Sequence, residues 1–203
     1  MSGVFVAFEG GEGVGKSTQI ARSAQWLRGL GHDVFETREP GGTKLGRQLR
    51  QLLLDPDGDV TPRAEALLYA ADRAQHVETV IRPALAGGAI VLSDRYVDST
   101  LAYQGTGRGL GDVRVITGWA TGGLLPDLTV LLDLDPQIGL HRANQRAVPD
   151  RLEGASLDFH EAVRAGFLAL AAEAPVRYVV LDAGLDTDTV ASRVQEAISA
   201  RLR

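Results

Sequence analysis

The sequence predicts an α/β fold in which a five-stranded parallel sheet is covered by helices on both faces. Short apolar runs alternate along the chain with segments of helical periodicity. The apolar runs are continuous, which is typical of strands that are buried on both faces. No repeat, low-complexity tract or long linker divides the 203 residues, so we expect a single domain spanning residues 1–203.

The elements follow in chain order. The predicted strands lie at residues 4–8, 34–35, 89–92, 128–134 and 178–181. The predicted helices lie at 17–29, around 45–53, from the Thr61–Pro62 start to about 86, at 136–141, and along the 190–202 stripe. In such sheets ligands bind beyond the carboxyl ends of the strands, so we expect the functional residues there.

Composition narrows the possible functions. The net charge of −5 gives no general electrostatic attraction for nucleic acid, so we expect no nucleic-acid partner. The chain has no cysteine, which excludes disulfides and thiolate chemistry. Its four histidines are scattered and form no metal-ligand spacing. No apolar run has the roughly 20 residues of a membrane span, and the start does not resemble a signal peptide. We therefore expect a cytoplasmic protein with no membrane partner.

The most specific motif follows the first strand. It matches G-x-x-x-x-G-K-[ST] between a strand and a helix, which predicts a three-layer P-loop NTPase fold that binds a nucleoside triphosphate, here expected to be ATP. The expected ATP-binding residues are Gly10, Gly11, Glu12, Gly13, Val14, Gly15, Lys16, Ser17 and Thr18. Lys16 is expected to reach the β- and γ-phosphates, and the Ser17 hydroxyl to ligate Mg²⁺. The alternative, a glycine-rich turn with a chance GKS, is disfavoured by the flanking elements.

A P-loop alone does not choose among GTPases, ATPases and small-molecule kinases. An Asn-Lys-x-Asp guanine-reading motif is absent, because Lys16 and Lys44 are the only lysines. The length suits a compact nucleoside monophosphate kinase. A nucleotide switch that signals to a protein partner remains the alternative from another class.

Several further motifs carry a resemblance to one family. Together with the P-loop, the chain resembles bacterial thymidylate kinase (dTMP kinase) in order and spacing from about residue 4 to about 182. The motifs are Arg38-Glu39-Pro40-Gly41-Gly42-Thr43, Asp94-Arg95-Tyr96, Ala102-Tyr103-Gln104-Gly105 and Pro126-Asp127-Leu128-Thr129. The resemblance implies transfer of the ATP γ-phosphate to dTMP, giving dTDP on the route to dTTP. It also implies Mg²⁺ as a cofactor and a homodimer built on helix faces. A kinase for another nucleoside monophosphate is the nearest alternative.

The resemblance also implies roles for single residues. Asp94 joins Ser17 at the metal, and Lys16 and Arg95 act in catalysis. The acceptor side is assigned to Glu12, Arg38, Pro40, Arg50, Tyr69, Arg73, Arg95, Thr100, Tyr103 and Gln104. Tyr69 takes the place where the family usually has a phenylalanine stacked on thymine, while Arg73, Thr100 and Gln104 read the base edge. Tyr103 crowds the 2′ position of the sugar, and Glu12 lies near its 3′-hydroxyl.

Simpler interpretations of four of these residues stay open. Arg50 is also compatible with a solvated helix surface, and Arg95 with an ion pair to Asp94. Arg73 is compatible with a surface cation–π pair with Tyr69, because residues four apart share a helix face. Tyr103 is compatible with a core tyrosine.

An arginine-rich segment at about 142–155 resembles the lid of a nucleotide kinase. Arg142, Arg146 and Arg151 are its candidate catalytic residues, closing over ATP and neutralising charge on the moving phosphoryl group, and Arg142 is also expected to bind ATP. Pro149 breaks regular structure there. Asn144 stands where similar family members often have another arginine. A solvated loop with incidental charge is the alternative.

Overall fold

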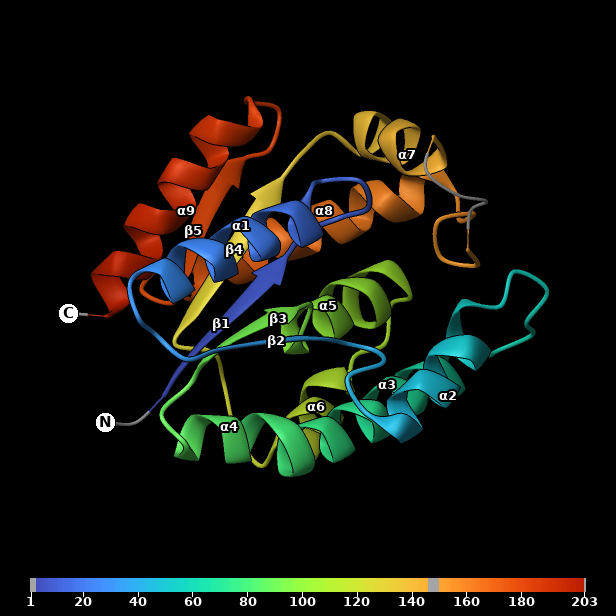
Figure 1. The fold of residues 1–203 in the computed structure, drawn as a ribbon. Coiled ribbons are helices and arrows are strands. Elements are labelled where there is room, and N and C mark those ends of the chain that lie inside the picture. Colours follow the sequence, from blue (N-terminus) through green and yellow to red (C-terminus); the bar gives the residue numbers. More distant parts are fainter. Residues whose placement is uncertain (1–2, 146–149, 203) are drawn as a thin grey trace.

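The computed structural model describes residues 3–145 and 150–202. Five parallel strands form one sheet in the order β2-β3-β1-β4-β5 (Figure 1). The strands are β1 (Val4–Glu9), β2 (Val34–Arg38), β3 (Ile90–Asp94), β4 (Leu128–Asp133) and β5 (Tyr178–Asp182). The α/β class and the five-stranded parallel sheet are thereby confirmed, with strand ends shifted by a few residues.

Helices cover both faces of the sheet. Helices α1 (Lys16–Gly29) and α9 (Thr187–Arg201) lie side by side on one face (Figure 1). The segments packed on the other face include α4 (Arg82–Ala86), α5 (Val97–Thr100), the π-helical η2 (Leu101–Gly107) and α8 (Leu157–Glu173). The remaining helices are α2 (Lys44–Leu54), α3 (Pro62–His76), the π-helical η1 (Val77–Ile81), α6 (Val113–Thr121) and α7 (Pro136–Asn144).

Alternate residues of β1 face opposite layers of the core, as the pleat of a strand requires. Val6 and Phe8 pack with Leu27 of α1 and Val194 of α9. Phe5 packs on the other face, in a cluster with residues of η1, β3 and α5. Because both faces are covered, the strands contain continuous apolar runs, and this pattern made them recognisable in the sequence.

The sheet register aligns the strand ends that carry the motifs. In the β1–β3 pair Phe8 lies opposite Asp94, and in the β2–β3 pair Arg38 lies opposite Asp94. The P-loop after β1, the Arg38 motif and the Asp94 motif therefore meet at one edge of the sheet. The fold thus places the three chemically informative segments next to one another.

The helix expected up to residue 86 is not uniform. It consists of α3, the π-helical turn η1 and the short α4. Pro83 lies just after η1 and has no N–H to donate to the carbonyl four residues earlier, so a regular α-helical ladder cannot pass through it. Segments η2 and α6 were not predicted; η2 contains two glycines and a buried glutamine instead of a periodic apolar stripe.

No helix within residues 3–145 and 150–202 is long and apolar enough to cross a membrane.

The burial of Leu27 between α1 and the sheet predicts how much its truncation lowers the free energy of unfolding. Leu27 is fully buried, so Leu27→Ala is expected to lower the free energy of unfolding by about 2–5 kcal/mol. Leu30, three residues on, is 59% exposed, and Leu30→Ala is expected to change it by less than about 0.5 kcal/mol. Urea denaturation of both variants is the measurement; equal losses would contradict the described packing of α1.

Candidate functional site

Two cavities lie at the carboxyl ends of the strands. The first, here called the loop cavity, measures about 180 Å³ and is lined by the P-loop residues 12–18 with Arg38, Glu39, Arg50, Asp94 and Arg95. The second, the inner cavity, measures about 130 Å³ and lies among α2, α3, η2 and the segment 150–153. Glu12, Glu39, Arg50 and Arg95 line both cavities, which are therefore contiguous.

The glycine-rich loop wraps closely around the Lys16 side chain. The Lys16 ammonium donates to the carbonyl oxygens of Gly10, at 3.1 Å, and Gly11, at 2.7 Å. Burial and the positive charge of Arg95 lower the pKa of Lys16 to about 8, against the opposing carboxylate of Glu12. At Gly13 the backbone has φ +66, and a Cβ there would lie 1.9 Å from the Gly139 carbonyl oxygen of α7. Only glycine fits at this contact.

Ser17 and Asp94 bring oxygen atoms together on the wall of the loop cavity. The Ser17 hydroxyl donates to Asp94 Oδ2 at 3.0 Å. Hydroxyl and carboxylate oxygens suit Mg²⁺, which takes six oxygen ligands, commonly including waters and substrate phosphates. Among the described residues, no group of three or more His, Asp or Glu side chains could hold a metal ion.

Arg95 is held at the junction of the two cavities. Its Nη1 donates to Gly10 O at 3.0 Å and Ser99 Oγ at 3.1 Å, and its Nη2 donates to Glu12 Oε1 at 2.6 Å and the Tyr103 hydroxyl at 3.2 Å. The expected alternative, a simple ion pair with Asp94, is wrong, because the carboxylate bonded to Arg95 is that of Glu12. Arg95 also adopts a left-handed backbone conformation, with φ 70.

Glu12 lies between Arg95 and Tyr103. The Tyr103 hydroxyl donates to Glu12 Oε1 at 2.6 Å, so its oxygen is left to accept from Arg95. Burial raises the pKa of Glu12, but Arg95, Lys16 and the Tyr103 hydrogen bond outweigh it and lower the pKa from 4.5 to about 2. Tyr103 is buried in an apolar cluster with Phe159 and Phe167 of α8, and it also lines the inner cavity. The interpretation as a core tyrosine and the interpretation as a substrate-binding residue are therefore compatible.

The inner cavity is lined by the residues expected to read the base. Tyr69, Arg73, Thr100 and Gln104 all line it, and all are buried. Arg73 donates to Glu39 Oε2 at 2.7 Å, Thr100 Oγ1 at 2.9 Å and the Tyr96 carbonyl at 2.9 Å. Its guanidinium lies 5.5 Å from the centroid of the Tyr96 ring. The alternative of a surface pair with Tyr69 is therefore wrong, since Arg73 is a buried, oriented donor.

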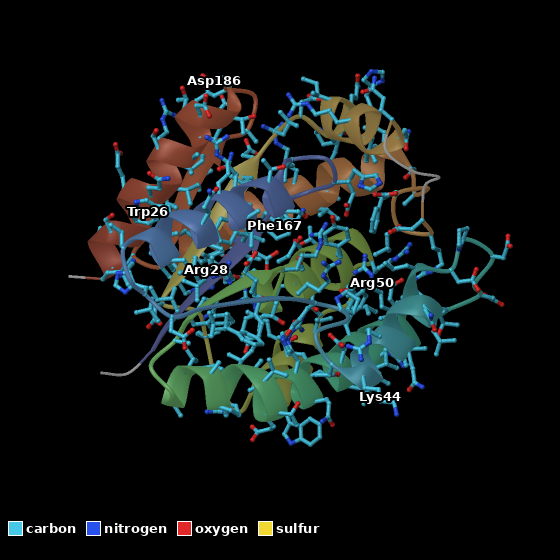
Figure 2. All side chains as sticks on the ribbon, viewed as in Figure 1. Trp26, Arg28, Lys44, Arg50, Phe167 and Asp186 are labelled. Carbon is cyan, nitrogen blue, oxygen red and sulfur yellow. The ribbon has the colours of Figure 1, made fainter. Side chains whose placement is uncertain are left out.

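Arg38, Pro40 and Arg50 border the space where the cavities meet. Arg50 Nη1 donates to the Pro40 carbonyl at 3.2 Å. Figure 2 shows Arg50 nearer the middle of the molecule than Lys44, which lies at the outer edge of the same helix. Because Arg50 lines both cavities, it is not a purely solvated surface residue. Of the two cavities, Arg38 lines only the loop cavity.

The two lid arginines that the structure describes, Arg142 and Arg151, bond to different parts of the fold. Arg142 Nη1 donates to the Ala183 carbonyl at 3.2 Å, in the loop after β5. Arg151 Nη2 donates to Glu65 Oε2 at 2.6 Å, and its Nε to the Leu53 carbonyl at 3.0 Å. Neither lines the loop cavity. Arg146 lies outside the described residues.

Three residues that hold candidate site residues were given no role in the sequence analysis. Glu39 holds Arg73, Ser99 accepts from Arg95, and Glu65 accepts from Gln104 Nε2 at 2.8 Å. Glu39 lies inside the Arg38–Thr43 motif. Glu65 lies four residues before Tyr69, so a charged residue on the same helical face as the expected base-stacking residue was an available signal.

Comparisons of the sequence with known proteins identify its relatives. A family model described as thymidylate kinase matches residues 8–194. The chain is 56% identical to a thymidylate kinase of Clavibacter sepedonicus, over 96% of this chain and 94% of the relative. It is 55% identical to one of Deinococcus radiodurans, over 98% of both chains. It is also 53% identical to one of Gloeobacter violaceus, over 98% of this chain and 96% of the relative.

The depressed pKa of Glu12 predicts a pH-dependent stability difference. Glu12 stabilises the fold above its ordinary pKa of 4.5, and this contribution is lost as pH falls toward about 2. Glu12→Gln is therefore expected to be less stable at pH 7 by on the order of 2 kcal/mol, with the gap closing below pH 4. Urea titrations of both proteins from pH 7 to pH 2.5 measure it. Glu78→Gln, at an exposed position, is the control; a pH-independent gap for Glu12→Gln would refute the prediction.

Proposed function

The chain belongs to the thymidylate kinase family, and from this membership we propose that its two contiguous cavities hold ATP and dTMP for direct phosphoryl transfer. A thymidylate kinase transfers the γ-phosphate of ATP to dTMP, giving dTDP for the synthesis of dTTP, and this chain is such an enzyme. The alternatives, another monophosphate kinase and a nucleotide switch, are not favoured. The observation that carries the proposal is that the loop cavity and the inner cavity share four lining residues: Glu12, Glu39, Arg50 and Arg95.

On the donor side, the P-loop is assigned to the ATP phosphates. Its backbone N–H groups and the N-terminus of α1 attract phosphate oxygens, and Lys16 interacts with the β- and γ-phosphates. Ser17 and Asp94 are assigned to Mg²⁺, which would neutralise charge on the bridging phosphate oxygens when bound. The hydrogen bond between these two side chains supports this assignment.

On the acceptor side, the monophosphate of dTMP is assigned to the space between the cavities. Arg38, Arg50 and Arg95 supply positive charge there. Since the terminal nitrogens of Arg95 are bonded to protein atoms, we assign its Nε–H to the acceptor phosphate. A phosphate oxygen of dTMP is already anionic at pH 7, so positioning and charge neutralisation replace a general base.

The nucleoside of dTMP is assigned to the inner cavity. Thymine stacks on Tyr69, with Pro40 on the cavity wall and its polar edge toward Arg73, Thr100 and Gln104. Tyr103 faces the 2′ position and favours deoxyribose. Glu12 accepts from the 3′-hydroxyl, which places the sugar beside the pair formed by Glu12 and Arg95.

The segment 142–155 is proposed as the lid. Arg142, Arg146 and Arg151 supply its positive charge during transfer, and closure excludes water that would otherwise hydrolyse ATP. Arg142 donates to the Ala183 carbonyl in the loop after β5, and Asp182-Ala183-Gly184 in this loop resembles the adenine-side loop of the family, which supports a place for Arg142 near the adenine of ATP.

The enzyme is also proposed to be a cytoplasmic homodimer. Leu67 on α3 and Val115 and Trp119 on α6 are 57%, 75% and 83% exposed, and these two helices pack against each other. Exposed apolar side chains gathered on adjoining helices favour association, and the family resemblance implies a second copy as the partner. ATP and dTMP are metabolites of the cytoplasm, which gives the location.

Removing Arg95 tests the acceptor site. Arg95→Ala is expected to lower kcat/KM for dTMP by at least about 100-fold, because it removes the charge at the acceptor phosphate. Coupled ADP release with ATP and Mg²⁺ against dTMP, dUMP, CMP, UMP, AMP and GMP is the measurement. Arg28→Ala, at an exposed ion pair with Glu36, is the control. Equal turnover of another monophosphate would contradict the roles of Arg73, Thr100 and Gln104 in recognising thymine. ATP hydrolysis that does not depend on an acceptor would contradict the assignment of the chain as a kinase.

A charge on α6 tests the dimer. Trp119→Glu is expected to convert the dimer into a monomer, because a carboxylate would be buried against the apolar face of the second copy. Sedimentation equilibrium measures the mass. Leu30→Glu, which places the same charge at an exposed leucine at the end of α1, is expected to remain dimeric. A wild-type monomer, or a dimer that survives Trp119→Glu, would contradict this interface.

A further inference from the structure

A buried carboxylate outside both cavities holds one of the residues that line the inner cavity. Glu65 of α3 is fully buried and lines neither cavity. Its Oε1 accepts from Gln104 Nε2 at 2.8 Å, and its Oε2 accepts from Arg151 Nη2 at 2.6 Å. Arg108 approaches both oxygens at 3.5 Å. A carboxylate is expensive to bury unless it is bonded in this way, so these contacts specify the position of Glu65 closely.

The contact with Glu65 determines which way the Gln104 amide points. A side-chain amide offers a donor nitrogen on one side and an acceptor oxygen on the other, whereas a carboxylate only accepts. The amide atom that faces Glu65 must therefore be the nitrogen. Gln104 lines the inner cavity and Glu65 does not, so the amide oxygen is the atom left for a ligand.

Beside this acceptor, the same wall offers donors. Arg73 Nη1 donates to Thr100 Oγ1 at 2.9 Å, so the Thr100 hydroxyl proton is free to be donated in turn. The wall thus presents donors from Arg73 and Thr100 next to the acceptor oxygen of Gln104. A pyrimidine-2,4-dione complements this pattern, with its O4 as acceptor and its N3–H as donor. Cytosine reverses it, with an amino group at C4 and a bare N3.

We propose that Glu65 is a positioning residue that selects thymine and uracil over cytosine by locking the orientation of the Gln104 amide. This inference rests on the proposed function, because it assumes that the inner cavity takes the base of the acceptor. Glu65 contacts no substrate in this role. Its chemistry matters because an acceptor-only side chain excludes the flipped amide, whereas a neutral amide at position 65 accommodates either orientation. Glu65 and Gln104 distinguish bases by the 2,4-dione edge that thymine and uracil share, so they are expected not to discriminate between dTMP and dUMP.

The test is the base selectivity of Glu65→Gln. The ratio of kcat/KM for dTMP to that for dCMP is expected to fall about tenfold, the value of one oriented hydrogen bond, mainly through a higher KM for dTMP. The dUMP to dCMP ratio is expected to fall equally. Arg108→Met, which removes a neighbour of the same carboxylate but leaves Gln104 bonded, is expected to keep the wild-type ratio. An unchanged ratio in a folded Glu65→Gln protein would overturn the proposal.

A double variant separates positioning from general damage. Gln104→Met removes the amide, so adding Glu65→Gln to it is expected to change the selectivity ratio no further. Additive losses would mean that Glu65 acts by another route and would overturn the proposal.

A measurement on the wild type serves if Glu65→Gln does not fold. The side-chain N–H pair of Gln104, assigned by its disappearance in Gln104→Met, is expected to resist solvent exchange before and after dTMP binds. Rapid exchange in the ligand-free protein would overturn the proposal. Failure of the proposed function would be distinguishable from failure of this inference, because the wild type would then not phosphorylate dTMP at all.

Discussion

The ion pair between Glu12 and Arg95 joins the two halves of the site. Glu12 belongs to the loop after β1 and Arg95 to the loop after β3, and these neighbouring strands bring the loops together. The left-handed backbone of Arg95 costs about 1–3 kcal/mol and persists only where surrounding contacts define it. Bonds to the Gly10 carbonyl, Ser99, Tyr103 and Glu12 supply that definition. One guanidinium therefore links the P-loop to the wall of the inner cavity.

Buried carboxylates repeat this arrangement around the cleft. Glu9 accepts from the backbone N–H groups of Tyr96 and Ser99 and so supports the turn that carries Arg95. Glu39 holds Arg73 and Glu65 holds Gln104. All three carboxylates are buried; Glu39 and Glu65 each hold a residue assigned to the substrate, and Glu9 supports the turn next to Arg95. Site residues oriented in this way lose little freedom when substrate binds, which favours selective recognition and fast transfer.

The packing gave two of the candidate residues partners that the sequence did not predict. Arg73 was compatible with a surface position next to Tyr69, but the described structure buries it against Glu39 and Tyr96. Arg151, one of the candidate lid arginines, donates to Glu65 and to the carbonyl of Leu53. In both cases the deciding partner is more than twenty residues away, so helical spacing and local charge gave no means of identifying it.

The sequence by itself determined the sheet, the P-loop and the residues at the ends of the strands. These features are local: continuous apolar runs specify buried parallel strands, and the glycine spacing with Lys16 and Ser17 specifies a phosphate loop. Only the tertiary structure decided which side chains pair across the cleft, because Glu12 with Arg95 and Glu65 with Gln104 meet through the packing of separate elements. A buried charge takes its role from the partners that desolvation forces it to find, and those partners are set by the fold.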